Sequence, residues 1–258
     1  MSRVGALLRE WRAVRRLSQL DLALEAGTSS RHLSCVETGK AQPSREMVAR
    51  LADTLGMPLR ERNTLLLAAG YAPEYPETAL TTAELAQARS AIDLILAHQE
   101  PYPAFVLNRH MDVLMTNEAA TRVGQFLCNS AHTNMLRKVF DPNDLRAVIV
   151  NWEEVAGSLI HDLHEEIAAA PSDAKGRALL DEILRYPGVP SRWRTSEFDA
   201  TLPPLLTIVF RKDDRLVRFF STFTRFGTPR DITLDELRIE CTFPADEATA
   251  ELCRSLAR

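Results

Sequence analysis

Apolar residues recur every three or four positions through the first seventy residues, which is the spacing of amphipathic helices. Glycines and prolines divide this region into short helices, because glycine favours a helix end and proline a helix start. Gly27, Gly56 and Gly70 stand where helices are expected to end, and Pro58 stands where the last one begins. The pattern predicts an all-α domain in which residues 17–39 form two short helices around Gly27.

Beyond Pro101 the period changes from 3.6 to 2, which predicts strands. The expected strands cover residues 104–108, 113–117, 205–212, 216–226 and 236–243. Helical patterns occupy an insertion after the second strand, at residues 118–128, 143–170 and 173–186. The connections at 109–112 and 212–215 are short enough for antiparallel hairpins. Alternation is expected to turn nine side chains toward the helices: Leu206, Ile208, Phe210, Phe219, Ser221, Phe223, Ile239, Cys241 and Phe243.

Two strands, a helical insertion and three further strands are the element order of a PAS-like domain, in which helices cover one face of an antiparallel sheet. Two prolines within residues 71–77 predict a stiff, extended boundary before it. A capping-box pattern at 81–84 then predicts the start of a connecting helix. We therefore expect three parts: an all-α domain over 1–72, a linker with a connecting helix over 73–100, and an α+β PAS-like domain with a five-stranded antiparallel sheet over 101–258.

Charge differs between the two expected domains. Up to residue 72, eleven basic residues stand against seven acidic ones, whereas from residue 73 twenty stand against twenty-eight. An acidic region repels DNA, so a nucleic-acid surface is expected only in the first domain. Because the basic excess is small, a monomer would bind DNA weakly, and a homodimer on two half-sites is expected. No apolar run reaches the roughly 20 residues that span a bilayer, and no secretory signal precedes the first helix, so we expect a cytoplasmic protein.

One face of the helix expected near residues 30–38 carries short polar side chains around a single arginine. At 100° per residue, five positions lie away from the apolar side: Ser29, Ser30, Arg31, Ser34 and Cys35. Small side chains let a helix sit deep in a DNA groove, and arginine can donate two parallel hydrogen bonds to guanine, worth about 1–3 kcal/mol of discrimination. Gln19 and Lys40 are expected at phosphates. An ordinary surface helical hairpin is the alternative.

The residues around this helix form a wider frame: Leu8, Arg12, Leu17-Ser18-Gln19, Leu22-Ala23, Ala26-Gly27, Leu33-Ser34, Val36-Glu37, Gly39, Pro43-Ser44 and Leu51-Ala52. The frame resembles the lambda-repressor-like, xenobiotic-response-element class of helix-turn-helix regulators. The resemblance implies a five-helix domain whose third helix enters the major groove. It also implies a partly buried ion pair between Arg12 and Glu37. The chain departs from many members at Cys35, where a longer polar residue is common.

Four segments of the second domain form another frame: residues 103–108, 112–117, 134–142 and 151–153. They are similar to segments of the MmyB-like ligand-binding domain, which implies that a small, largely apolar molecule is sensed, a fatty-acid-like one being an example. Six large or adaptable side chains are candidates for the lining of a cavity: Met115, Met135, Trp152, Trp193, Phe210 and Phe219. The same side chains suit a dry core equally well. The alternative is therefore a ligand-free dimerisation or protein-interaction module.

Residues 161–166 contain the main candidate for catalytic chemistry. His161 and His164 share a helical face beside carboxylates, which is a possible start of a metal set. The spacing is not His-Glu-x-x-His, however, so a solvated helix face is the favoured interpretation. No nucleophile elbow, phosphate loop or Cys-x-x-Cys pair occurs. We expect no enzyme activity, metal, cofactor or disulfide, and interpret the chain as a transcription regulator that binds double-stranded DNA, expected to be a palindromic operator, and a small apolar ligand.

Overall fold

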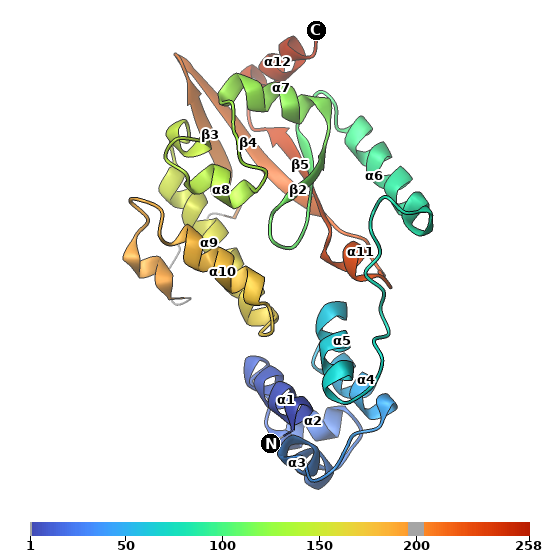
Figure 1. The fold of residues 1–258 in the computed structure, drawn as a ribbon. Helices are drawn as coiled ribbons and strands as arrows, with labels where there is room; N and C mark the ends of the chain where they lie inside the picture. Colours follow the sequence, from blue (N-terminus) through green and yellow to red (C-terminus); the bar gives the residue numbers. More distant parts are fainter. Residues whose placement is uncertain (1, 196–203) are drawn as a thin grey trace. The chain divides into compact units, whose positions relative to one another are not determined.

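The computed structural model describes residues 2–195 and 204–258. The chain forms two compact units (Figure 1). The first unit comprises residues 1–77 together with two later segments, 166–174 and 228–235. The second unit comprises residues 78–165, 175–227 and 236–258.

Five helices form the N-terminal part of the first unit: α1 (Arg3–Val14), α2 (Gln19–Glu25), α3 (Ser30–Thr38), α4 (Arg45–Thr54) and α5 (Leu59–Ala68). Serine begins four of them, since Ser2, Ser18, Ser29 and Ser44 each accept a hydrogen bond from a backbone N–H of the first turn. The five-helix domain is therefore confirmed. The helix expected near residues 30–38 is also confirmed, because α3 covers these residues.

The apolar stripes of these helices meet in one core. Its largest fully buried side chains are Leu8, Trp11, Leu22, Leu33, Leu51, Leu55 and Leu65. Burial of one such side chain contributes about 1.5–3 kcal/mol to folding. The inner side of α3, with Leu33 and Val36 in this cluster, is thus held by hydrophobic packing.

A five-stranded sheet forms the centre of the second unit. Its strands are β1 (Ala104–Leu107), β2 (Val113–Thr116), β3 (Thr207–Lys212), β4 (Arg215–Thr224) and β5 (Arg238–Pro244). They lie in the order β2-β1-β5-β4-β3, and every neighbouring pair is antiparallel. The α+β PAS-like fold and its five-stranded antiparallel sheet are therefore confirmed.

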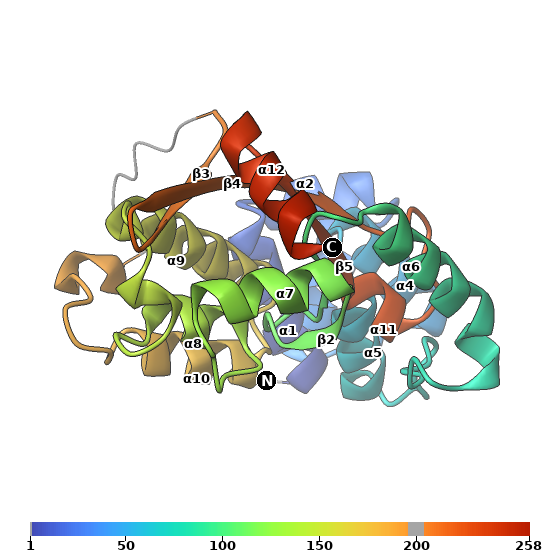
Figure 2. The ribbon, with the colours of Figure 1, turned by 90° about the horizontal axis from the view of Figure 1, so that it is seen from above.

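Helices precede, interrupt and follow the strands of this sheet. They are α6 (Ala86–His98), α7 (Glu118–Leu127), α8 (Met135–Phe140), α9 (Trp152–Ala169), α10 (Ala174–Ile183), α11 (Ile232–Glu236) and α12 (Glu247–Leu256), with short 3-10 turns at Ala83–Leu85, Leu145–Ala147 and Ser191–Arg194. On one face of the sheet, the paired residues Val106 and Ile239 share a core with Ile92 and Leu96 of α6. Seen from above, α12 lies beside α7 (Figure 2), and it also contacts β4 and β5.

The expected grouping of side chains from β4 and β5 is wrong. Phe223 of β4 lies opposite Glu240 of β5, and Thr222 lies opposite Cys241. Directly paired residues point to the same side of a sheet, so Phe223 and Cys241 lie on opposite faces. Alternation shows which residues of one strand share a face. It does not show which face of the neighbouring strand they join, because a shift of the pairing by one residue moves them all to the other face. Glu240, rather than Cys241, is therefore on the face that carries Phe223.

Three helices of the structure had not been predicted: α8, α11 and α12. The first two span only six and five residues, which is too short for a 3.6 period to be recognised. The helix start expected from the capping box at 81–84 is displaced: the cap of the first 3-10 turn is Thr82, one residue later than expected and without a side-chain cap hydrogen bond, and the α-helix begins at Ala86. The pattern over 143–170 likewise contains a short 3-10 turn before α9 begins at Trp152.

Candidate nucleic-acid interface and ligand-binding domain

α2 and α3 form a helix-turn-helix whose turn is defined by glycine and serine. Ser18 begins α2 with a capping box. Gly27 has a left-handed backbone with φ of 64°, which allows the chain to change direction directly after α2. Ser29 then caps α3 by accepting a hydrogen bond from the backbone N–H of His32 at 3.1 Å. Gly39, with φ of 80°, ends α3, so both ends of the helix are determined locally.

The outer side of α3 carries the residues predicted to meet DNA. Four of the predicted positions are exposed, namely Ser29, Ser30, Arg31 and Lys40. The other two, Ser34 and Cys35, are half-buried. Gln19, predicted at a phosphate, donates an amide hydrogen to Glu37 at 2.7 Å. Its contact with DNA stays a prediction, for which the second amide hydrogen is the donor.

A buried carboxylate joins α3 to α1 and α2. Glu37 is 0% exposed and accepts hydrogen bonds from Arg12 Nε at 3.0 Å and Gln19 Nε2 at 2.7 Å. Arg9 Nε lies 3.6 Å from the same carboxylate, and Arg12 also donates to the carbonyl of Leu17 at 2.9 Å. Burial alone would raise the pKa of Glu37, but the hydrogen bonds from Arg12 and Gln19 outweigh it and hold the pKa below its ordinary value. The ion pair implied by the resemblance is present.

Gly5 is a site residue that the sequence pattern did not single out. It is buried where α1 passes α3. A Cβ atom at this position would lie 2.7 Å from the carbonyl carbon of Glu37 and closer still to the carbonyl oxygen. Because both are backbone atoms, α3 itself would have to move. The available clue was a glycine inside a helical pattern, where it costs about 1 kcal/mol relative to alanine unless packing requires it.

Gly5→Ala is expected to lower the free energy of unfolding of the first unit by about 1–3 kcal/mol through overpacking, although alanine is the better helix former. Calorimetry of the full chain measures the change, and hydrogen exchange of the α3 amides assigns the transition. Gly124→Ala in α7 is the matched control, because no atom beyond its chain neighbours and its own helix backbone lies within 4 Å of the added Cβ. Stability equal to that of the unaltered chain would contradict the close approach of α1 and α3.

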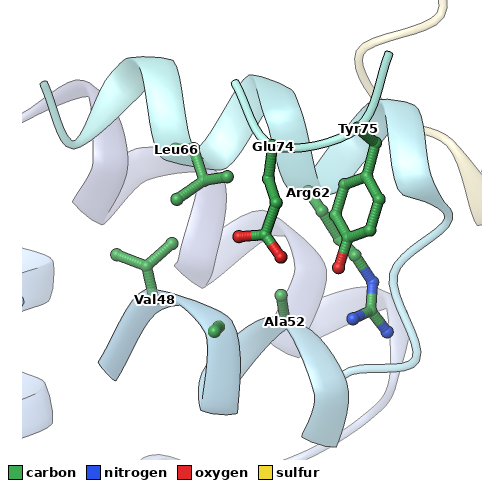
Figure 3. A pocket seen from close by; sticks show the side chains of 7 residues that line it. Val48, Ala52, Arg62, Leu66, Glu74 and Tyr75 are labelled. Carbon is green, nitrogen blue, oxygen red and sulfur yellow. The ribbon is translucent and has the colours of Figure 1, made fainter. Parts of the chain in front are cut away.

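The extended segment after α5 is held by one asparagine. Asn63 donates to the carbonyl of Tyr75 at 2.7 Å and accepts from the backbone N–H groups of Glu74 and Tyr75 at 2.9 and 3.1 Å. In Figure 3, Glu74 and Tyr75 lie over a small pocket whose lining is Val48, Ala49, Ala52, Arg62, Leu66, Glu74 and Tyr75. The start of the expected linker is therefore docked on α4 and α5.

Two later segments of the chain also pack on α5 within the first unit. The Ser172 hydroxyl lies 2.6 Å from both carboxylate oxygens of Glu61, which is 2% exposed. Asp235 accepts a hydrogen bond from the backbone N–H of Leu59 at 3.1 Å. Pro58 precedes α5 and makes no side-chain cap bond, so Asp235 supplies a favourable negative charge at this helix start. The first turn of α5 is thus completed by residues that follow far along the chain.

The structure places the six residues predicted to line a ligand cavity on several elements of the second unit. They are Met115, Met135, Trp152, Trp193, Phe210 and Phe219. Met115 packs with the core beneath α6, and Met135 begins α8. The two phenylalanines meet across β3 and β4 with ring centroids 6.4 Å apart, and the two tryptophans meet at 5.7 Å. Four of the six residues thus form two aromatic pairs, and their contact with a ligand stays a prediction.

The two tryptophans belong to an aromatic cluster of the second unit. Phe140 lies edge-on to Trp152 and Trp193, with centroid distances of 5.9 and 6.5 Å. Trp193 is 2% exposed, and Trp152 Nε1 donates to the carbonyl of Val139 at 2.8 Å. The guanidinium of Arg146 lies 3.7 Å from the Trp152 ring centroid, a cation–π contact. Tight packing and satisfied polar atoms are the properties of a core.

The next side chains to consider are the histidines and cysteines, which could bind a metal ion or act as nucleophiles. His164 Nε2 lies 2.9 Å from the carbonyl oxygen of Trp193. Both histidines of α9 are half-buried while Asp162 and Glu165 beside them are exposed, so the expected solvated face is partly covered. Among the described residues, no cluster of three or more histidine, cysteine, aspartate or glutamate side chains is arranged so that it could hold a metal ion. Burial raises the pKa of Cys128 and Cys253 to about 11, which disfavours reactive thiolates. Nor does any described helix have the length and apolar character needed to cross a membrane.

These features define a class of protein, in which a helix-turn-helix DNA-binding domain is joined to an α+β domain. Family models give the same division, since residues 3–65 match a helix-turn-helix domain and residues 88–256 match the MmyB-like transcription regulator ligand binding domain. The second match spans more than half of the chain, which therefore belongs to the family of MmyB-like transcription regulators. The protein is a DNA-binding transcription regulator with a ligand-binding domain, and this is the domain arrangement of a regulator rather than of an enzyme.

Two further comparisons add nothing to this conclusion. No curated protein matches the chain. A solved structure described as an RNA-binding Light-Oxygen-Voltage receptor is similar at 14% identity and a TM-score of 0.24, over 99% of this chain and 62% of that one. The chain thus spans less than two thirds of the receptor's length, and a similarity this low supports no inference about function.

Proposed function

We propose that the protein acts as a homodimer in which α3 of each copy reads one half of a palindromic operator. The observation that carries the proposal is the fixed and exposed face of α3. Glu37 fastens the inner side of the helix, while Ser30 and Arg31 face solvent. A helix held in this way can enter the major groove of double-stranded DNA with its N-terminal residues at the base edges. In this proposal Arg31 pairs with guanine, and Gln19 and Lys40 contact phosphates.

The domain division proposed for this activity is 1–72 for DNA binding, 73–100 for connection and 101–258 for sensing. The modest positive charge of the first part supports dimerisation, because two half-sites multiply the affinity of each weakly charged domain. We place the protein in the cytoplasm with its DNA. No catalytic step is proposed.

We further propose that a small, largely apolar ligand of the second domain controls DNA binding. Support comes from Ser172 and Asp235, which lie within the sequence range of the ligand-binding family model and contact α5. These residues follow α9 and β4 along the chain, so movement of those elements would act on the first turn of α5. A ligand changes DNA affinity only as far as it binds two such arrangements with different affinity.

A second candidate is a ligand-free second domain that serves dimerisation alone. It is favoured by Trp193 and Phe219, both 2% exposed and in contact with other rings. Native mass spectrometry of the purified chain distinguishes the two candidates. A co-purified apolar molecule released on unfolding supports the sensor, and its absence together with DNA binding that no apolar molecule alters supports the dimerisation module.

Arg31→Ala tests base reading by α3. The variant is expected to lose about 1–3 kcal/mol of binding free energy on the operator and to relax preference at one base pair of each half-site. Fluorescence anisotropy with the operator and its single-base variants measures both effects. Arg89→Ala removes the same charge from an exposed position of α6 and serves as the control. Equal weakening of Arg31→Ala on all sequences would contradict base reading and indicate a phosphate contact.

A further inference from the structure

An exposed ion pair joins the start of α4 to the linker that follows α5. Arg45, the first residue of α4, donates from Nη2 to a carboxylate oxygen of Glu74 at 3.1 Å, and its Nη1 lies 3.5 Å from the carbonyl oxygen of Ala72. Both side chains of the pair are nearly half exposed. In Figure 3, Glu74 points from the extended segment toward α4. An oxyanion of the chain itself thus already occupies the guanidinium at the start of α4.

The position of Glu74 is set by the backbone of the linker rather than by the ion pair. Asn63 of α5 accepts a hydrogen bond from the N–H of Glu74 at 2.9 Å and donates to the carbonyl of Tyr75 at 2.7 Å. Asn63 is buried, so water competes little for these bonds. An exposed ion pair alone holds two flexible side chains only weakly. The docked linker is therefore what keeps the carboxylate next to Arg45.

Arg45 follows the helix expected in the groove after a short and fixed stretch of chain. The backbone N–H of Lys40 donates to the carbonyl of Cys35 in the last turn of α3 at 2.8 Å, and the hydroxyl of Tyr71 donates to the carbonyl of Pro43 at 3.0 Å. The chain from Lys40 to Arg45 spans at most about 17 Å. Phosphates line both sides of a major groove about 12 Å wide. With α3 in the groove, the side chain of Arg45 is therefore within reach of the DNA backbone.

The docked linker also removes a large share of the positive charge of the DNA-binding domain. Residues 1–72 carry eleven basic and seven acidic residues, and residues 73–77 add two carboxylates and no basic residue, which leaves eleven against nine. Both carboxylates are paired with arginines of the domain, Glu74 with Arg45 and Glu77 with Arg60. Each phosphate that a basic side chain neutralises adds to DNA affinity. In a domain with so small a basic excess, one occupied arginine matters.

We propose that Arg45 is a phosphate contact of the DNA-bound protein, and that Glu74 competes with the phosphate while the linker is docked. The proposal rests on DNA binding by α3 and adds a means of regulating it. Arginine binds carboxylate and phosphate oxygens with the same charge-assisted hydrogen bonds, so one excludes the other. The linker continues into the second unit at residue 78. A movement that lifts the linker from α4 and α5 therefore frees Arg45 for DNA.

Glu74→Gln tests the competition and leaves the linker docked, because Asn63 binds the backbone of residue 74 and glutamine keeps the shape of the side chain. Fluorescence anisotropy of the full chain with a short, labelled duplex of mixed sequence measures affinity between about 50 and 200 mM salt. Freeing one arginine should steepen the slope of log affinity against log salt by about 0.9 and raise affinity about fivefold near 150 mM salt. Glu77→Gln removes the same charge from the same linker, beside Arg60 of α5, and is the matched control, whose slope should not change.

Arg45→Ala identifies the group that Glu74 occupies. In this background, Glu74→Gln should no longer steepen the slope, because the side chain that it would free is absent. An unchanged slope in Glu74→Gln alone, or equal steepening in Glu77→Gln or in the Arg45→Ala background, would overturn the competition at Arg45 and leave DNA binding by α3 intact. If neither the unaltered chain nor any variant bound DNA, the DNA-binding function would be overturned together with this proposal.

Discussion

Glu37→Ala is expected to lower the free energy of unfolding of the first unit by about 3–5 kcal/mol, because removal of one partner leaves a buried ion pair uncompensated. Arg12 is the partner affected most, since its side chain is 18% exposed and donates to the lost carboxylate at 3.0 Å. Gln19 would lose its acceptor as well. Calorimetry with hydrogen exchange of the α3 amides measures the loss. DNA affinity should fall with it, because α3 would no longer be fixed.

Glu10→Ala is the matched control, because Glu10 lies exposed on α1 and surface substitutions usually change stability by less than about 0.5 kcal/mol. A melting transition of Glu37→Ala equal to that of the control would show that the pair does not fasten α3.

The same carboxylate predicts the direction of the acid dependence of stability. The pKa of Glu37 in the folded chain lies below its ordinary value of 4.5, so folding favours the ionised form. Its contribution is fully present above pH 4.5 and is lost as the pH falls through the folded-state pKa. The stability difference between the unaltered chain and Glu37→Gln should therefore shrink on acidification below that value, and a difference that grows would contradict the assigned direction.

Trp193→Ala is expected to destabilise the second unit by about 3–5 kcal/mol, as a large-to-small change in a packed core does. The ring is 2% exposed and contacts Trp152 and Phe140 at centroid distances of 5.7 and 6.5 Å. Denaturant unfolding of the full chain measures the loss. Trp193→Phe keeps a ring in place and should lose less than half as much.

A small stability change in Trp193→Ala would have a different meaning. If stability fell by under about 1 kcal/mol while binding of a small apolar molecule was lost, Trp193 would be a ligand contact rather than core. That result would restore the role predicted from the sequence and would contradict the core assignment made from its burial and ring contacts.

The helix-turn-helix was predictable because its signals are local. Gly27 and Gly39 end helices through left-handed backbone conformations, and Ser29 caps the next helix with its own hydroxyl. Each effect involves residues within a few positions of one another, so the sequence order carries it directly. Gly5 was not found, because its requirement comes from the backbone of Glu37 on another helix.

Which side chains of β4 and β5 share a face of the sheet could not be predicted for a related reason. Alternation in β5 separates Glu240 from Cys241, but it does not say which of them lies opposite Phe223. Only the pairing of strands from distant parts of the chain decides that. The ligand contacts were likewise predicted from residue type, because the sequence does not show how side chains pack. Trp193 is an example: the structure buries its ring against the ring of Phe140.

The central claim is that α3 reads a specific sequence, and selection of fragments from a random DNA library by the purified full chain tests it most directly. The account predicts one enriched motif with two inverted half-sites, their centres one helical turn of about 10 base pairs or a multiple apart. Selection with Arg31→Ala should recover the same motif with one position in each half-site relaxed. Recovery of no enriched sequence by the folded, unaltered chain would contradict the account.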